Sequence, residues 1–306
     1  MNSSFLTLHK LIVLLLGFTF IGCNSLKVEE SVVGLGWSNN SVNTVVFRNS
    51  AVVSTNEYQF TAYYNPEGYL ILAKRRLNSN TWKIKKTAYK GNVKDAHNTI
   101  SIAMDADGFL YVVGAADHDI WIYDLSDPGS PELVGTWIGE YFHDIEVYNN
   151  KLYGAAIYSG LFYIVDVSDK TNPVTLVSYN TGGGYISTHD CAVSEDEKYL
   201  FTGDENTGGH VKVWDIQDYG NINLVAEYMT NPSHSAHNLY VRPGTDLLII
   251  SYYADGTRIL DISDPTNPVE AAYYDTSNIE GLYVGNWGTY AYLPSGYIIS
   301  SDIETG

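Results

Sequence analysis

Short runs of alternating apolar and polar residues fill the chain from residue 43 onward, and turn residues separate them. In the run TWKIKKTAYK, Trp82 and Ile84 alternate with Lys83 and Lys85, which is typical of a strand with one solvated face. The turn sequences Asn-Pro-Glu-Gly and Asn-Ser-Asn mark two of the breaks between such runs. This part of the chain shows no helical period. The pattern therefore predicts an all-β fold built from antiparallel hairpins.

A sequence repeat organises this pattern. Five stretches align on an aspartate that follows an apolar strand: IWIYDLSDPGSPELVG, FYIVDVSDKTNPVTLV, VKVWDIQDYGNINLVA, RILDISDPTNPVEAA and YIISSDIETG. The aligned residues are Asp124, Asp166, Asp215, Asp261 and Asp302. A carboxylate in a turn accepts nearby backbone N–H groups, and proline fixes φ. We therefore interpret these aspartates as turn residues and assign no catalysis to them.

The repeat has the length of one β-propeller blade. About four strands fit into each 41–49 residues, and radial repetition of such units protects the sheet edges. We expect about six blades, near 43–94, 95–142, 143–188, 189–236 and 237–279, with an incomplete one at 280–306. The stretch SVVGLGW at 31–37 could supply the strand that the last blade lacks and so close the ring. Alternatively, the sequence is a piece of a larger ring.

The first 23 residues predict export. Lys10 precedes the apolar run LIVLLLGFTFIG, which is too short to span a bilayer comfortably, and Cys23 follows. This layout resembles a bacterial lipoprotein signal, in which Cys23 is lipidated and becomes the mature N-terminus. We expect residues 1–23 to be the signal and 24–42 a tether that includes the possible closing strand. The protein would then be anchored by lipid in the outer membrane or at the cell surface. Alternatively, simple cleavage would release a periplasmic or secreted protein.

The charge is acidic overall and unevenly distributed. A formal charge of -18 argues against nucleic acid and against an anionic membrane surface as partners. Residues 30–94 carry about +6, whereas residues 95–306 carry about -25. Eight of the seventeen basic residues lie between Lys74 and Lys94. They form either solvated outer strands or a basic rim for an anionic ligand.

Histidine recurs once in each of four expected blades, at spacings of 46, 46 and 48 residues: His97, His143, His189 and His237. Histidines that begin the first strands of successive blades would lie near the central axis, where each can bond a neighbour's backbone. The dipeptides His143-Asp144 and His189-Asp190 also suit local carboxylate–imidazole bonding. A ligand site that includes His97 and a metal site are the alternatives. Imidazoles and carboxylates together suit Zn²⁺, and Ca²⁺ is the other ion considered.

The segments SVVGLGW, SVNTVVFRNSAVVS, AYYNPEGYLILAKRRL, WKIKKTAYKGNVKDAHNTISI and DADGFLY carry a resemblance to another group of proteins. Residues 31–112 resemble the N-terminal part of secreted BNR repeat-containing proteins, which are similar to ulvan-type polysaccharide lyases. The resemblance implies that His97, in a His-Asn motif, and His118 lie at an active site. A lyase that acts beside a uronic acid needs a base, an acid and donors for the substrate carboxylate. Histidine can be the base or the acid, and arginine suits a carboxylate.

The stretches YIVDVSDKTNPV and RILDISDPTNPV and the HD and HN dipeptides carry a second resemblance. Through them, residues 115–306 resemble LVIVD-repeat propellers of the choice-of-anchor B type, which are mostly surface proteins without an assigned reaction. The propeller of residues 43–306 is thus BNR-like to about 112 and LVIVD-like afterwards.

These observations predict an exported, monomeric β-propeller lipoprotein that touches the membrane only through its anchor. Its expected partner is a polysaccharide or a cell-surface protein. The candidate binding residues are Asn98, His143, His189, His237 and Arg242. The alternative is an ulvan-type polysaccharide lyase that uses His97 and His118.

Overall fold

The computed structural model describes residues 30–44, 51–94, 98–105, 107–114, 119–127, 131–182, 187–293 and 295–305. Residues 1–31 form one unit and residues 32–306 another, and the second carries the fold described below. Its described residues form strands and turns without an α-helix, which confirms the predicted all-β class. Nothing in the described ranges forms a helix that could cross a membrane.

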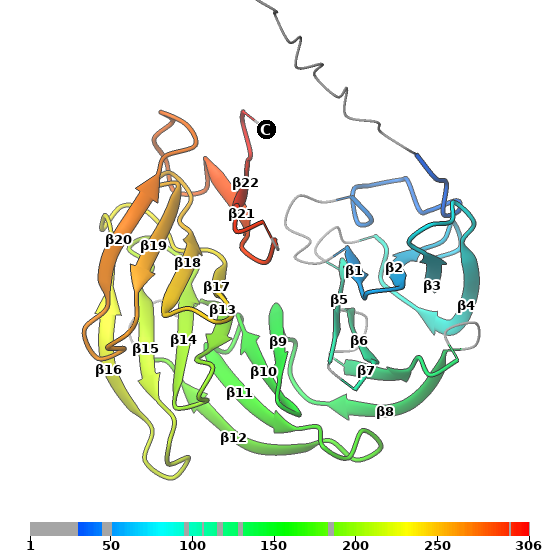
Figure 1. Cartoon of the computed structure of the whole chain (residues 1–306), viewed down its shortest axis with the longest axis horizontal. Helices are drawn as coiled ribbons and strands as arrows, with labels where there is room; N and C mark the ends of the chain where they lie inside the picture. Colours follow the sequence, from blue (N-terminus) through cyan, green and yellow to red (C-terminus); the bar gives the residue numbers. More distant parts are fainter. Residues whose placement is uncertain are drawn as a thin grey trace, which may run out of the picture. The chain divides into compact units, whose positions relative to one another are not determined.

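The first three sheets each contain four antiparallel strands in chain order (Figure 1). The first holds β1 (Val52–Ser54), β2 (Tyr58–Tyr64), β3 (Tyr69–Arg76) and β4 (Lys83–Lys90). The second holds β5 (Ile100–Met104), β6 (Phe109–Gly114), β7 (Asp119–Asp124) and β8 (Glu132–Ile138). The third holds β9 (Asp144–Tyr148), β10 (Lys151–Ala156), β11 (Leu161–Asp166) and β12 (Val174–Asn180).

Two further four-stranded sheets and a two-stranded one follow. The fourth sheet holds β13 (Thr188–Val193), β14 (Tyr199–Asp204), β15 (Val211–Asp215) and β16 (Asn223–Tyr228). The fifth holds β17 (Leu239–Val241), β18 (Leu247–Ser251), β19 (Thr257–Asp261) and β20 (Val269–Tyr274). The last holds β21 (Asn286–Tyr290) and β22 (Ile299–Asp302).

Successive sheets pack side by side as the blades of a propeller. The first strand of each sheet is the innermost, and β5, β9, β13 and β17 contact the inner strands of the sheets before them (Figure 1). The two-stranded sheet continues the series through contacts between β18 and β21. The observed sheets match the expected blades to within one residue, with β13 beginning at Thr188, so the periodicity located the blades correctly.

Apolar clusters fill the spaces between neighbouring sheets. Adjacent residues of one strand enter different clusters: Leu152 of β10 packs toward the second sheet, and Tyr153 packs toward the fourth. Tyr111 of β6 likewise faces the third sheet, while its neighbours Leu110 and Val112 face the first. Because side chains alternate along a strand, both faces of these middle blades are buried.

The aligned aspartates act as turn residues, as the repeat predicted. In all five, the Oδ1 atom accepts the backbone N–H two residues later, at 2.7–3.0 Å: Asp124, Asp166, Asp215, Asp261 and Asp302. The hydrogen bond from Ser263 holds the pKa of the Asp261 carboxyl below its usual range. This local role explains why the motif recurs in the second to sixth blades.

The segment 31–37 lies beside the first sheet, whereas we expected it to add a strand to the last. The backbone N–H of Trp37 donates to the carbonyl oxygen of Tyr64 in β2 at 2.8 Å. The side chain of Asn43 binds the same carbonyl oxygen at 2.7 Å and accepts the Tyr64 N–H at 2.8 Å. These bonds occupy both backbone groups of Tyr64, and they hold the segment at the end of β2.

A buried ion pair joins the second sheet to the third, next to the expected junction of the two sequence families. Lys170 Nζ lies 3.1 Å from Asp105 Oδ2, and both side chains are only 7% exposed. The ammonium group also donates to Asn150 Oδ1 at 2.6 Å. Asp105 accepts further hydrogen bonds from the Phe109 N–H and the Tyr111 hydroxyl. The Asp105 carboxylate therefore has its hydrogen bonds satisfied, and Lys170 supplies the positive charge that balances it.

We predict that Lys170→Met lowers the free energy of unfolding by about 3–5 kcal/mol, because the Asp105 carboxylate stays buried without its partner. Urea denaturation measures the change. The matched control is Lys198→Met, since the Lys198–Asp196 pair at 2.8 Å is about half exposed on both sides. Its loss should cost less than about 1 kcal/mol. Equal losses in the two variants would contradict this account of the junction.

Candidate functional site

A central cavity of about 670 Å³ lies where the inner strands converge. Residues of β1, β5, β9, β13, β17 and β21 all line it, so every sheet contributes to its wall. Three carboxylates belong to the lining: Asp144, Glu146 and Asp190. So do three tyrosine rings: Tyr240, Tyr290 and Tyr292. Tyr292 packs edge-on against both other rings, at centroid distances of 5.9 and 5.5 Å.

Two of the three cavity carboxylates, those of Glu146 and Asp190, take up protons more readily than exposed ones. Burial raises the pKa of Glu146 to about 7, although the Val193 N–H donates to its carboxylate at 2.7 Å. Burial and the nearby Asp144 carboxylate raise the pKa of Asp190 well above its usual value. No lysine or arginine is among the described residues that line the cavity. The cavity is therefore polar and acidic.

Three of the four repeated histidines meet at this centre. The ring centroids of His143 and His189 lie 4.1 Å apart, and those of His189 and His237 lie 4.2 Å apart. Each histidine stands at the beginning of an inner strand, which is why one residue per blade can form a row. Trp287 extends the row, with its ring centroid 4.4 Å from that of His237. The fourth predicted member, His97, lies outside the described residues.

The imidazoles of His189 and His237 are neutral at ordinary pH. Burial lowers the pKa of His237 to about 3. Burial, with His143 and His237 as neighbours, lowers the pKa of His189 well below its usual value. Nδ1 of His237 hydrogen-bonds the Trp287 carbonyl oxygen at 2.6 Å, so it carries the proton and Nε2 carries the lone pair.

Three buried ring nitrogens have no hydrogen-bond partner among the described residues: His143 Nδ1, His189 Nδ1 and His237 Nε2. A buried polar atom without a partner costs about 1–3 kcal/mol. Packing of the three rings alone does not explain why three unpartnered nitrogens lie so close together.

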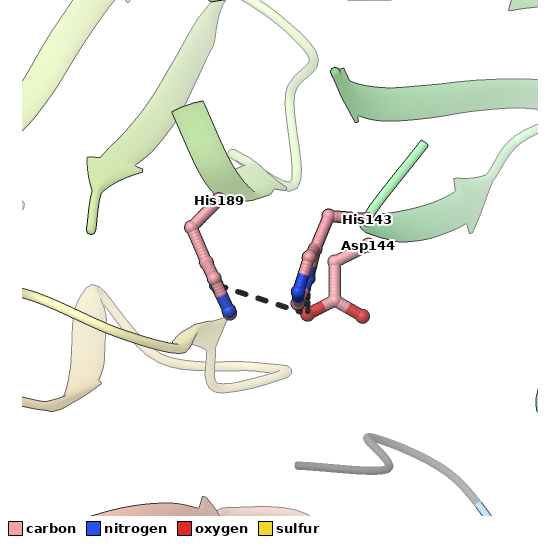
Figure 2. A group of neighbouring side chains, drawn as sticks. All are labelled: His143, Asp144 and His189. Carbon is pink, nitrogen blue, oxygen red and sulfur yellow. Dashed lines mark ion pairs between the residues drawn. The ribbon is translucent and has the colours of Figure 1, made fainter. Parts of the chain in front are cut away.

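Two carboxylates lie between these imidazoles. Asp144 Oδ2 is 3.9 Å from His143 Nδ1 and 4.0 Å from His189 Nδ1 (Figure 2). Glu205 lies between the next pair, with oxygen–nitrogen distances of 3.8 Å to Nε2 of His189 and of His237. Two groups of nitrogen and oxygen donors that could hold a metal ion therefore share His189.

The expected pairing of His189 with Asp190 does not form. Asp190 Oδ2 instead accepts the Leu239 N–H at 2.7 Å, while His189 faces Asp144. The cause is an irregular register in β13, where Thr188 and Asp190 oppose consecutive residues of β14 and His189 is the extra residue. A β-bulge of this kind turns a side chain away from the direction that simple alternation gives it.

The remaining predicted residues are His118, Cys23, Asn98 and Arg242. His118 and Cys23 lie outside the described residues. Asn98 is buried just before β5, and its Oδ1 has no hydrogen-bond partner among the described residues. Arg242 follows β17 at the opposite end from His237 and lies beside Gly296. Five extended residues span roughly 16 Å, which separates Arg242 from the histidines.

Sequence reasoning missed Glu205 and Tyr253. The Tyr253 hydroxyl donates to Glu205 from a position 48 residues later, one repeat along the chain. Tyr253 is completely buried and has a φ of 39°, which is costly for a residue with a bulky side chain. A search for polar residues separated by one repeat length is the signal that could have found this pair.

Comparisons with known proteins agree with both sequence resemblances. Residues 58–144 match the family described as BNR repeat-containing family member. Residues 141–181 and 252–276 match the LVIVD repeat. No curated protein matches the chain.

Solved structures of low sequence identity share the fold. The β-propeller domain of Cps50 (Swd1) from Myceliophteria thermophila aligns with a TM-score of 0.61 and 11% identity, over 84% of this chain and 80% of that one. A protein from Lactobacillus plantarum aligns with a TM-score of 0.58 and 13% identity, over 73% and 70% of the two chains. The chain is a β-propeller with BNR-like and LVIVD-like repeats.

We predict that Asn238→Leu destabilises the propeller by about 2–3 kcal/mol. Asn238 is buried, and its Nδ2 lies 3.1 Å from Asp144 Oδ2 and 3.4 Å from Asp190 Oδ2, so it bridges carboxylates of two other sheets. A hydrogen bond to a charged group contributes about 1.5–3 kcal/mol. Chemical denaturation measures the loss.

The control for this prediction is Asn223→Leu, because Asn223 Nδ2 donates to the Asn221 carbonyl on the exposed surface. Its effect should stay within about 0.5 kcal/mol. An Asn238 variant as stable as the wild type would show that the bridge does not hold the inner strands.

Proposed function

We propose that this protein is an exported surface module that binds carbohydrate in its central cavity. The observation that carries the proposal is the cavity itself, where carboxylates and tyrosine rings from several blades face one space. Binding sites for small polar molecules are concave, with aromatic walls and a few convergent polar groups. Sugars offer hydroxyl groups to carboxylates and apolar ring faces to tyrosines.

The charge favours a neutral polysaccharide over a polyuronate. The cavity lining is acidic, and residues 95–306 carry about -25. Most of the basic side chains between residues 74 and 94 stand on β3 and on β4, the outermost strand of the first sheet, whereas β1 lines the cavity. They are therefore poorly placed to offset an anionic ligand there.

An ulvan-type lyase is the second candidate. The match to the BNR repeat-containing family covers residues 58–144, which include His97 and His118. The resemblance of residues 31–112 to ulvan-type lyases implies that these two residues lie at an active site, where an imidazole can act as base or acid. The acidic cavity opposes this candidate, since a polyuronate would meet like charge.

We also propose that lipid on Cys23 attaches the protein to the outer membrane or the cell surface. The apolar run of residues 11–22 directly before this cysteine supports the proposal. A surface position would bring the cavity to polysaccharides too large to enter the cell.

We predict that a neutral polysaccharide binds and that Tyr292→Ala weakens its binding about tenfold, because the ring contacts both other cavity tyrosines. Affinity electrophoresis against a panel of neutral and uronic-acid polymers measures this. Tyr274→Ala on the exposed strand β20 is the control and should bind like the wild type.

The same panel decides between the two candidates when ultraviolet absorbance is followed for new 4,5-unsaturated ends. A rise that His97→Ala abolishes would replace the binding module with the lyase. Absence of a rise on every uronic-acid polymer, with metal added, would exclude the lyase. Absence of binding to the whole panel would overturn the carbohydrate proposal.

For the anchor, we predict that Cys23→Ser moves the protein from the membrane fraction to the soluble fraction, because the serine hydroxyl does not replace the thiol that accepts the lipid. Fractionation of expressing cells followed by immunoblotting measures the change. Unchanged membrane association of the variant would refute lipidation at this residue.

A further inference from the structure

We propose that His143, Asp144 and His189 form a binding site for one divalent transition-metal ion of the Zn²⁺ class. The site stands at the junction of the third and fourth sheets, and it does not depend on the proposed carbohydrate binding. Figure 2 shows the three side chains approaching one another from two adjacent inner strands.

The donor atoms lie nearly at coordination spacing. One donor atom of each of His143, Asp144 and His189 lies within 4.8 Å of the other two, and Asp144 Oδ2 is 3.9 Å from Nδ1 of His143 and 4.0 Å from Nδ1 of His189. Ligands of a tetrahedral Zn²⁺ with bonds of about 2.0–2.1 Å stand roughly 3.3–3.4 Å apart. Both nitrogen–oxygen distances would therefore shorten by roughly 0.5–0.7 Å around an ion.

The ring of His189 places a suitable atom beside Asp144. Its Nδ1 lies 4.0 Å from Asp144 Oδ2, and a neutral ring that carries its proton on Nε2 would offer the Nδ1 lone pair to an ion there. That nitrogen is buried, and it has no hydrogen-bond partner among the described residues, as is also true of His143 Nδ1. A metal ion would satisfy both atoms at once.

The surroundings hold the triad and leave it open on one side. The side-chain amide of Asn238 donates to Asp144 Oδ2, and the ring of His189 packs between the rings of His143 and His237. Such outer contacts orient metal ligands. His143 and Asp144 line the central cavity, and the side chain of His143 is 18% exposed. A water molecule or a ligand oxygen from the cavity would complete the coordination.

The donor set and the shared histidine decide between the possible ions and sites. Two imidazoles and one carboxylate form a set typical of zinc sites with an open position, whereas Ca²⁺ takes six to eight oxygen ligands. The second group, with Glu205 and His237, would use Nε2 of His189, and its carboxylate already accepts a hydrogen bond from the Tyr253 hydroxyl. One neutral imidazole offers one lone pair, so both groups cannot be filled together.

The test is zinc binding to the purified full chain after chelator treatment, measured by isothermal titration and by elemental analysis after dialysis. We expect one equivalent of Zn²⁺. His143→Gln and His189→Gln should each weaken binding at least 100-fold, whereas His210→Gln, a control at a partly exposed histidine, should leave it unchanged. His237→Gln should change it less than tenfold. Far-ultraviolet circular dichroism verifies that each variant is folded.

If the variant at the buried His189 does not fold, the test uses the variant at the partly exposed His143 together with Co²⁺ binding to the wild type. Bound Co²⁺ should give the visible absorption of a four-coordinate nitrogen–oxygen site, and His143→Gln should remove it. Failure of the wild type to retain Zn²⁺ would overturn the proposal. Loss of binding in His237→Gln but not in His143→Gln would also overturn it, because the ion would then belong to the other group.

Discussion

Burial of each middle sheet on both faces is the constraint on which the rest of this structure depends. Leu152 and Tyr153 are neighbours in β10, yet one packs toward the preceding sheet and the other toward the following sheet. A single blade cannot bury both of its faces, so each one needs a neighbour on either side. This requirement brings the inner strands of successive blades together around one axis, and it fixes which residues can meet there.

Polar groups on those inner strands have few routes to water, so they must bond to one another. The backbone N–H of Leu239 donates to Asp190, and the side chain of Asn238 donates to Asp144. Both donors come from the blade that follows β13. The Glu146 carboxylate accepts the Val193 N–H in the same way, across 47 residues. Against this well-bonded background, the unpartnered Nδ1 atoms of His143 and His189 are exceptions. Packing accounts for the row of rings but not for the buried, unpartnered nitrogen atoms, which a bound ligand would satisfy.

The sequence was most informative where one repeat can be compared with another. Strand alternation and the recurring aspartates located the blades and assigned the turn role of residues such as Asp261, because both signals are local. The orientation of His189 could not be predicted, since it depends on a bulge that shifts the register of β13 by one residue. The contact between Tyr253 and Glu205 was missed because it joins equivalent turns of two blades and involves an unusual φ. Contacts between equivalent turns of neighbouring blades thus join residues about one repeat apart in the sequence. Reasoning strand by strand overlooks this spacing.

The two sequence families meet in one cavity, and this affects how far either resemblance can be extended. β5 brings residues of the BNR match to the wall, whereas β9, with Asp144 and Glu146, begins where the two matches overlap and continues into the LVIVD match. An active site whose residues come from several blades is retained only if the later blades keep the residues that they contribute to it. Here Arg242, the one arginine considered for a uronic acid, stands at the far end of β17 from the histidines. The described part of the centre is instead acidic and rich in imidazole nitrogen. That combination suits a bound cation and a neutral polar ligand better than a polyanion, so the LVIVD-like blades determine the chemistry available at the axis.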